Sequence, residues 1–268
     1  MSLPVAPTTM LRWPAEELWE ALQPLCPGLS VEVATEVDST SSRLLERARA
    51  GDASPCLLVA ERQTAGRGRL GRSWEASPGA SLTFSLALPL APRAWSGLSL
   101  VAGVALAEAL HERVRLKWPN DLWLVDGAGQ GRKLGGILIE TAQAAGGPRV
   151  AVVGVGLNIR QEAIAGETTS RASLDELESG AQAPATLLRI AAPLLRVLQA
   201  FEREGFAPWM ARYAARDALA GRSIRLLQHQ GGSSEGQALG VDEQGALLVQ
   251  TAAGLQTITS AEVSVRPC

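Results

Sequence analysis

Two consecutive stretches decide the fold: Gly131-Arg132-Lys133-Leu134-Gly135-Gly136-Ile137-Leu138-Ile139-Glu140 and Val153-Gly154-Val155-Gly156-Leu157-Asn158-Ile159. They belong to two apolar runs, Leu134–Thr141 and Arg149–Asn158, whose length and β-branched content are typical of buried strands. The Ala-Gly-Gly-Pro segment at residues 145–148 has the composition of a turn. We therefore predict two strands joined by a turn.

Helices and strands alternate on both sides of this pair. The expected helices are Trp13–Leu25, a helix capped by Asp38 or Ser39 that ends near Gly51, Leu98–Arg113, about Ala185–Arg203, and a segment within Phe206–Ala218. The other expected strands are Val31–Val37, Leu57–Ala60, Ser81–Leu88 and Val114–Lys117. This order predicts an α/β domain built on a mixed sheet.

The pattern changes at Gly221, after which short β-like runs alternate with glycine-containing turns. The runs are Ile224–Leu227, Gly236–Val241, Leu247–Gln250 and Leu255–Thr259. Four or five short strands in this length predict a small all-β domain of SH3-like size. We expect an N-terminal helical extension at 1–30, a catalytic domain at 31–219 and the β domain at 220–268.

Composition narrows the class of protein. Charged residues make up 19% of the 268, and the 27 acidic and 25 basic side chains nearly cancel, which argues against a constitutive nucleic-acid binder. The three cysteines, Cys26, Cys56 and Cys268, stand far apart, so neither a disulfide framework nor a zinc site is expected. We find no signal peptide and no run long enough to span a membrane. A soluble, cytoplasmic protein is expected.

A glycine- and arginine-rich loop is the first candidate site. It reads Gly66-Arg67-Gly68-Arg69-Leu70-Gly71-Arg72 and follows Gln63 and Thr64. Glycines allow a ligand to approach the backbone, and arginine forks suit phosphate or carboxylate. A solvated basic turn or an RNA-binding arginine tract has the same composition. The loop lacks the Gly-Lys-Ser/Thr ending of a Walker loop.

The run Lys117-Trp118-Pro119-Asn120-Asp121 is the second candidate. Pro119 restrains Trp118 to extended backbone, so a strand is expected to end here with Asn120 and Asp121 at its mouth. An amide and a carboxylate together can orient a hydroxyl or hold Mg²⁺ on nucleotide phosphates. The alternative is an Asn-Asp turn that caps its own backbone.

The two opening stretches carry the last candidates. Lys133, at the start of its strand, is suited to neutralise a carboxylate and then the charge that develops when that carboxylate attacks a phosphate. A surface lysine is the alternative. Asn158 has the groups to contact an adenine edge, and Gly154 and Gly156 can make room for the ring. Strand glycines also often mark bulges, so this signal is weak alone.

Order and spacing give these motifs their specificity. The segment Asp38-Ser39-Thr40-Ser41, the loop from Gln63 to Arg72 with Trp74, and the runs at 117–121, 131–140 and 154–158 together resemble the biotin–protein ligase family. The similarity extends from about Val31 to the terminal domain with its Val241–Leu248 hairpin. It implies a catalytic domain of the biotin/lipoate ligase type, which is class II synthetase-like, followed by an SH3-like barrel.

The resemblance assigns roles to individual residues. It implies biotin contacts from Ser39, Thr40, Ser41, Gln63, Arg67, Gly68, Arg69, Lys133, Gly135, Gly136 and Gly156. It implies ATP contacts from Arg67, Arg69, Trp74, Lys117, Asn120, Lys133 and Asn158. Arg67, Arg69, Lys133 and Asp121 are the expected catalytic residues, with Asp121 near the metal. Ser41 stands where many members have asparagine, which puts one hydrogen bond to the biotin ureido group in question.

The implied reaction uses ATP, biotin and Mg²⁺. Biotin becomes biotinyl-5′-adenylate and then passes to a lysine of a biotin carboxyl carrier protein domain, as in acetyl-CoA carboxylase. A lipoate or octanoate ligase or transferase is the alternative enzyme. A biotin-sensing repressor is disfavoured, because the 30 residues before Val31 contain one helix and no basic recognition helix. No nucleic-acid or membrane partner is expected. A homodimer formed through sheet edges is possible, as in relatives.

Overall fold

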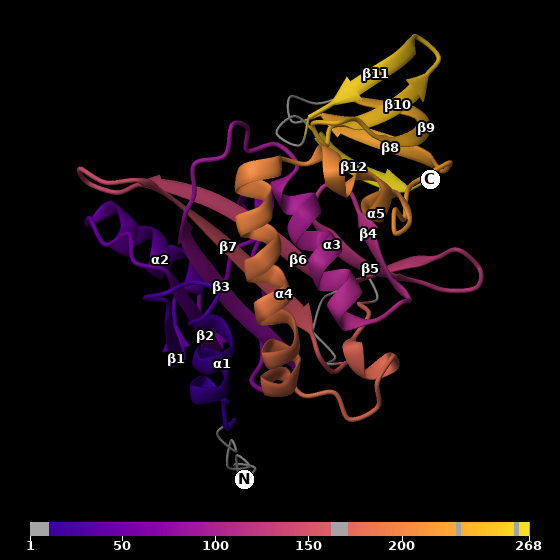
Figure 1. The fold of residues 1–268 in the computed structure, drawn as a ribbon. Helices are drawn as coiled ribbons and strands as arrows, with labels where there is room; N and C mark the ends of the chain where they lie inside the picture. The colour runs from indigo at the N-terminus through magenta and orange to yellow at the C-terminus, as the bar shows by residue number, and fades with distance from the viewer. Residues whose placement is uncertain (1–10, 162–170, 229–231, 260–262, 268) are drawn as a thin grey trace.

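A seven-stranded sheet forms the body of the computed structural model, which describes residues 11–161, 171–228, 232–259 and 263–267. The strand order is β1-β2-β3-β7-β6-β5-β4, with β1 parallel to β2 and all other neighbours antiparallel (Figure 1). The strands are β1 (Ser30–Val37), β2 (Cys56–Gln63), β3 (Ser81–Pro89), β4 (Val114–Lys117), β5 (Asp121–Val125), β6 (Gly131–Gln143) and β7 (Arg149–Asn158). The predicted mixed sheet is confirmed.

Strand β5 is the element that sequence reasoning missed. It returns antiparallel to β4, with Lys117 opposite Asp121, so residues 118–120 form a tight hairpin turn. Strand β4 ends at Lys117, in line with the expectation that a strand ends at this run, but Asp121 then begins a further strand that was not predicted. Leu122, Trp123 and Leu124 are all buried, so β5 lacks the apolar–polar alternation that marks a half-buried strand.

Different helices cover the two faces of the sheet. One face packs against α1 (Ala15–Leu22), α3 (Leu98–Leu110) and α4 (Ala183–Glu204), and the other against α2 (Thr40–Arg49). Helix α3 ends three residues earlier than expected. Alternate residues of β2 show the division, since Leu57 contributes to the first core and Leu58 to the second. Ser39 is the N-cap of α2, because its Oγ accepts from the Ser42 amide at 3.4 Å.

A second sheet follows residue 220. Its order is β11-β10-β9-β8-β12, all antiparallel: β8 (Ser223–Gln228), β9 (Ser233–Val241), β10 (Leu247–Thr251), β11 (Gly254–Ile258) and β12 (Val263–Pro267). We call it the terminal sheet. Its buried side chains, such as Ile224, Leu247 and Val265, join the same apolar core as α3 and α4. It lies beside α5 (Met210–Ala214) in Figure 1.

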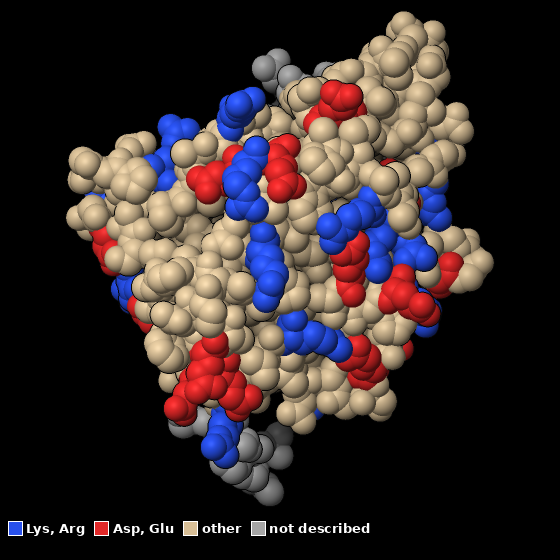
Figure 2. Space-filling view, viewed as in Figure 1, with Lys and Arg blue, Asp and Glu red and all other residues tan. Residues whose placement is uncertain are grey.

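The described cysteines, Cys26 and Cys56, are free thiols. Cys56 is a buried free thiol, as expected, and burial raises its pKa to about 11. Cys268 lies outside the described residues. Acidic and basic side chains are interspersed on the face that α3 and α4 cover (Figure 2). Within the described ranges, no helix combines the length and apolarity needed to cross a membrane.

One buried carboxyl predicts a pH dependence of stability. Leu219 N–H donates to Asp217 Oδ1 at 2.8 Å, whereas Oδ2 has no hydrogen-bond partner, and burial raises the pKa of Asp217 to about 6. The folded chain therefore binds more protons than the unfolded chain between pH 4 and 6, so stability falls as pH rises through this window.

We expect Asp217→Asn to be more stable than the wild type at pH 7.5, by at most about 3 kcal/mol, and nearly equal to it at pH 4. Urea denaturation at both pH values measures this difference. Glu112→Gln, which changes an exposed carboxyl nearby, serves as the control. A loss of stability at pH 7.5 in Asp217→Asn would contradict the prediction.

Candidate active site

The predicted site residues meet in one cavity on the α2 side of the large sheet. Those that line it are Ser39, Thr40, Ser41, Gln63, Arg67, Gly68, Arg69, Trp74, Lys117, Asn120, Asp121, Lys133, Gly136 and Gly156. Near the cavity the strands present mainly glycines and polar residues to this face, whereas farther along them Leu58, Val150 and Val152 form the second core beneath α2. Thr83 and Ser85 on β3 thus face the α2 side, while Phe84 between them belongs to the core beneath α3 and α4.

Uncharged polar groups form one end of the cavity. Gln63 Oε1 accepts from the Thr40 amide at 2.8 Å and from the Thr40 hydroxyl at 3.1 Å. Ser85 Oγ lies 2.7 Å from Thr40 Oγ1 and 3.0 Å from Ser41 Oγ. Ser85 was not among the predicted residues. Its only signal is a polar residue two positions after Thr83 within an apolar strand.

Gly154 and Gly156 make room for neighbouring protein side chains. A Cβ on Gly154 would lie 2.4 Å from Ser41 Oγ, and one on Gly156 would lie 2.4 Å from the Trp74 ring. Both contacts are shorter than any real Cβ contact. The two glycines therefore let the start of α2 and the end of the arginine loop pack directly on β7.

The arginine loop folds into an ordered cover over the cavity. Gly68 N–H donates to Arg72 O at 2.7 Å, and Trp74 N–H donates to Gly66 O at 2.8 Å. Leu70, at the tip, has a left-handed backbone with φ of 61° and an exposed side chain. Cross-loop hydrogen bonds of this kind are not those of a solvated turn.

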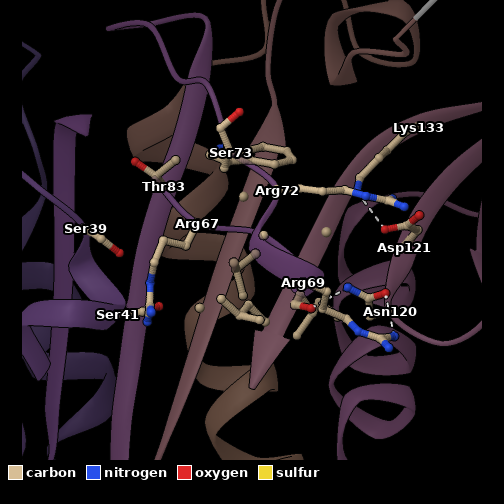
Figure 3. Close-up of a pocket in the computed structure, with 18 of the residues that line it drawn as sticks. Ser39, Ser41, Arg67, Arg69, Arg72, Ser73, Thr83, Asn120, Asp121 and Lys133 are labelled. Atoms are coloured by element: carbon tan, nitrogen blue, oxygen red, sulfur yellow. Dashed lines mark hydrogen bonds and ion pairs between the residues drawn. The ribbon is translucent and has the colours of Figure 1, made fainter. Parts of the chain in front are cut away.

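Arginine side chains from the loop extend to the sheet and to the hairpin turn. Arg67 Nη2 lies 2.5 Å from Glu140 Oε2 on β6. Arg69 Nη1 donates to Asn120 Oδ1 at 3.4 Å (Figure 3). Burial lowers the pKa of Arg69, which remains a cation because an arginine is not deprotonated in proteins. Glu140 was quoted in its motif without a role, and its partner is 73 residues away.

Two lysines flank a single carboxylate at the other end of the cavity. Lys133 Nζ lies 2.7 Å from Asp121 Oδ1, and Lys117 Nζ lies 3.8 Å from Asp121 Oδ2 (Figure 3). Lys117 is 5% exposed. A Cβ on Gly136 would lie 3.2 Å from Lys133 Nζ, so the glycine leaves space for that ammonium group. Lys133 is therefore part of the cavity wall, although 38% of its side chain is exposed.

Charge identifies what the cavity can bind. Five basic side chains and one carboxylate line it: Arg67, Arg69, Arg72, Lys117, Lys133 and Asp121. A concave site with such an excess of positive charge attracts anions. Trp74 adds an aromatic face, with Lys133 Nζ 5.7 Å from its ring centre. The arrangement suits a ligand with a neutral polar head and several negative charges.

The residues do not form a resident metal site. No cluster of three or more His, Cys, Asp or Glu side chains occurs in the part of the chain that the structure describes. Asp121 is the lone carboxylate in the cavity and already faces two ammonium groups. Mg²⁺ prefers several oxygen ligands, which these residues do not supply by themselves.

Gly135 and Asn158 are the two predicted site residues that do not line the cavity. Asn158 is buried, and its Nδ2 donates to Lys133 O at 3.2 Å and to Ala172 O at 3.0 Å, so its amide joins three chain segments. Gly135 packs on β7, where a Cβ would lie 2.6 Å from Gly156 O. Both support the backbone around Lys133.

We expect Gly156→Ala to displace Trp74 and loosen the arginine loop, because overpacking of this kind costs about 1–3 kcal/mol. Trypsin cleavage within residues 67–72 measures loop opening, since the loop offers several arginines. Gly127→Ala, where a Cβ has open space, is the control. Equal cleavage rates for the two variants would show that Trp74 does not depend on Gly156.

Comparison with known proteins supplies the context for this geometry. Residues 33–158 match the family described as Biotin/lipoate A/B protein ligase family, and residues 220–266 match the Biotin protein ligase C terminal domain. The chain is 37% identical over 254 residues to the bifunctional ligase/repressor BirA of Escherichia coli, covering 89% of this chain and 75% of that protein.

Two other relatives match over nearly their whole length. The chain is 35% identical to the biotin–[acetyl-CoA-carboxylase] ligase of Mycobacterium tuberculosis, covering 87% of this chain and 88% of that protein. The solved structure of a biotin protein ligase from Aquifex aeolicus in complex with biotin and ATP superposes with a TM-score of 0.74 at 31% identity, covering 89% of this chain and 99% of that one.

Proposed function

The chain belongs to the biotin protein ligase family, and on that premise we propose that it adenylates biotin with ATP and transfers biotin to a lysine of a carrier domain. One observation carries the proposal: a single cavity joins an uncharged hydroxyl-lined end to a strongly cationic end. Biotin has a polar, uncharged ureido ring at one end and a carboxylate at the other.

The hydroxyl-lined end is the proposed site of the ureido ring. Ser39, Thr40, Ser41 and Gln63 would contact it. Ser85 is fully buried and does not line the cavity, and its hydroxyl would hold those of Thr40 and Ser41 in place. The Ser41 hydroxyl would replace the asparagine amide of many members. The dithiolane ring of lipoate has no hydrogen-bonding groups to match these hydroxyls, which favours biotin over lipoate or octanoate.

The cationic end is the proposed site of adenylation. An oxygen of the biotin carboxylate attacks the α-phosphorus of ATP, and the bond to the bridging oxygen breaks to release pyrophosphate. Lys133, Arg67 and Arg69 would reduce the repulsion between the two anions and stabilise the charge that develops in the transition state. Lys117 and Asn120 would contact the phosphates, and Trp74 would contact the adenylate.

Magnesium enters this scheme with the substrate as Mg-ATP. Asp121 is the carboxylate nearest the proposed phosphates, and it would reach the ion after the phosphates have drawn Lys117 and Lys133 away. The ion would offset part of the negative charge on the phosphates, which makes pyrophosphate a better leaving group.

In the second half-reaction, the deprotonated amine of a carrier lysine attacks the adenylate carbonyl. A C–N bond forms, the C–O bond to the phosphate breaks, and AMP leaves. No covalent enzyme intermediate is needed. The cover formed by the arginine loop would keep water from the mixed anhydride until the carrier arrives. The proposed carrier is the biotin carboxyl carrier domain of a carboxylase such as acetyl-CoA carboxylase, in the cytoplasm.

We further propose that a homodimer, where one forms, would use β1. The edges of the large sheet are β1 and β4. Along β4, Leu116 N–H donates to Arg216 O and Leu116 O accepts from Ala218 N–H, both at 2.8 Å, so this edge is covered by its own chain. Edge β1 includes Val33, whose side chain is exposed.

The activity is tested by incubating the purified chain with Mg-ATP, an equal mixture of biotin and lipoate, and a biotin carboxyl carrier domain. We expect mass spectrometry to show biotin, and not lipoate, on one carrier lysine, with AMP released only when biotin is present. Absence of labelling on several carriers would reject the ligase, and lipoyl addition would establish the alternative.

We expect Arg67→Ala to release biotinyl-adenylate about tenfold to a hundredfold faster than the wild type, because one charge-assisted contact is lost. Gel filtration of the loaded enzyme measures adenylate retention over time. Arg62→Ala, which breaks the exposed Arg62–Glu36 pair just before the loop, is the matched control. An unchanged release rate in Arg67→Ala would exclude a role for this side chain in holding the adenylate.

A further inference from the structure

A buried hydrogen bond joins the terminal sheet to the hairpin turn of the active site. Trp118 Nε1 donates to the backbone carbonyl of Gly245 at 3.0 Å, and the two residues are 127 positions apart. Trp118 is 1% exposed and does not line the cavity. Its neighbours in the chain, Lys117 and Pro119, do line it. The indole therefore acts on the site only through the backbone of the turn.

The turn that accepts this bond is rigid. It connects β9 to β10 and is closed by hydrogen bonds from Asp242 N–H to Ala246 O and from Gly245 N–H to Asp242 O, each 2.9 Å long. Asp242 Oδ1 also accepts from the amides of Gln244 and Ala246 at 2.9 Å. We call residues 242–246 the docking turn. A turn closed by its own hydrogen bonds holds the Gly245 carbonyl in a defined position.

Packing brings the docking turn against the same part of the active site. Gly245 has φ of +78°, and a Cβ there would lie 2.9 Å from Gly97 Cα and 3.0 Å from Leu100 Cδ1, at the start of α3. Ser99, which lies between Gly97 and Leu100 in the chain, donates its hydroxyl to Pro119 O at 3.0 Å. The active-site turn is thus held from two directions.

The terminal sheet also reaches the cavity itself. Val265 on β12 is buried and lines the cavity, so one wall comes from the terminal sheet. Gly245 lies in the turn between two strands of the same sheet. The hydrogen bond from Trp118 therefore links this wall to the turn that carries Asn120 and Asp121.

We propose that Trp118 is a positioning residue through which the docking turn sets the phosphate end of the active site. The proposal rests on the proposed ligase function, and it concerns the hydrogen bond between Trp118 and Gly245 rather than the terminal sheet as a whole. The biotin end, formed by α2, β2 and β3, has no described hydrogen bond to the terminal sheet.

The test measures biotin-dependent exchange of pyrophosphate into ATP. Trp118→Phe keeps the aromatic ring and removes the N–H donor, leaving Gly245 O buried without its partner. We expect KM for ATP to rise about three- to tenfold while KM for biotin stays within twofold. Trp209→Phe is the matched control, because Trp209 is also buried but its indole N–H has no hydrogen-bond partner within the described residues.

A second pair of variants tests the other side of the contact. Gly245→Ala should push the docking turn away from α3 and give the same selective rise in KM for ATP. Gly254→Ala introduces a similar positive-φ alanine into the same sheet, with φ of +110° and open space around the Cβ, and should leave both KM values unchanged. The double variant of Trp118→Phe and Gly245→Ala should show less than the sum of the single effects.

The outcomes separate the two proposals. A wild-type chain without biotin-dependent exchange rejects the ligase function. Wild-type exchange with equal rises in both KM values, or with no rise in Trp118→Phe, overturns the positioning role. If Trp118→Phe does not fold, as judged by circular dichroism, the comparison of Gly245→Ala with Gly254→Ala decides the question alone.

Discussion

Asp121 lies between Lys133 and Lys117 at the cationic end of the cavity, and the charge balance of the candidate active site depends on this arrangement. Lys117 is almost fully buried, and a buried ammonium group needs a nearby carboxylate to offset its desolvation. The backbone provides that pairing directly, because Lys117 and Asp121 are opposite one another in the β4–β5 hairpin. Without Asp121, the ammonium groups of Lys117 and Lys133 would lose the carboxylate that offsets their mutual repulsion. The carboxylate thus holds the site together until an anionic substrate replaces it as the partner of the lysines.

Close packing around glycines allows the remaining parts of the site to meet. Ser41 approaches β7 at Gly154, Trp74 lies on Gly156, and Lys133 extends over Gly136. Each of these glycines faces the α2 side of the sheet, where alternate strand positions near the cavity are small or polar. The opposite side carries the large apolar residues that pack against α3 and α4. One sheet therefore serves as core on one face and as the floor of the cavity on the other.

The sequence predicted the features that depend on local chemistry. Ser39 as the cap of α2, the arginine loop and the position of Lys133 all follow from short motifs, and the structure brings them together. Features that arise from tertiary contacts gave no such signal. Glu140 meets Arg67 across 73 residues, Ser85 is one of three hydroxyl residues in an otherwise apolar strand, and Trp118 bonds a residue 127 positions away. Asn158 was expected to contact an adenine edge, and the two backbone carbonyls that its amide nitrogen joins are tertiary contacts that no local motif signals.

The charge of the cavity gives a physical reason for the order of the proposed reaction. Five basic side chains against one carboxylate leave an excess of four positive charges, which favours binding of both anionic substrates in the same space. Each substrate relieves repulsion among the cations, so each offsets part of the cost of bringing the other's negative charge close. After pyrophosphate leaves, the remaining positive charge would face the single phosphate of the adenylate. This attraction would help to retain the reactive anhydride until a carrier lysine reaches it.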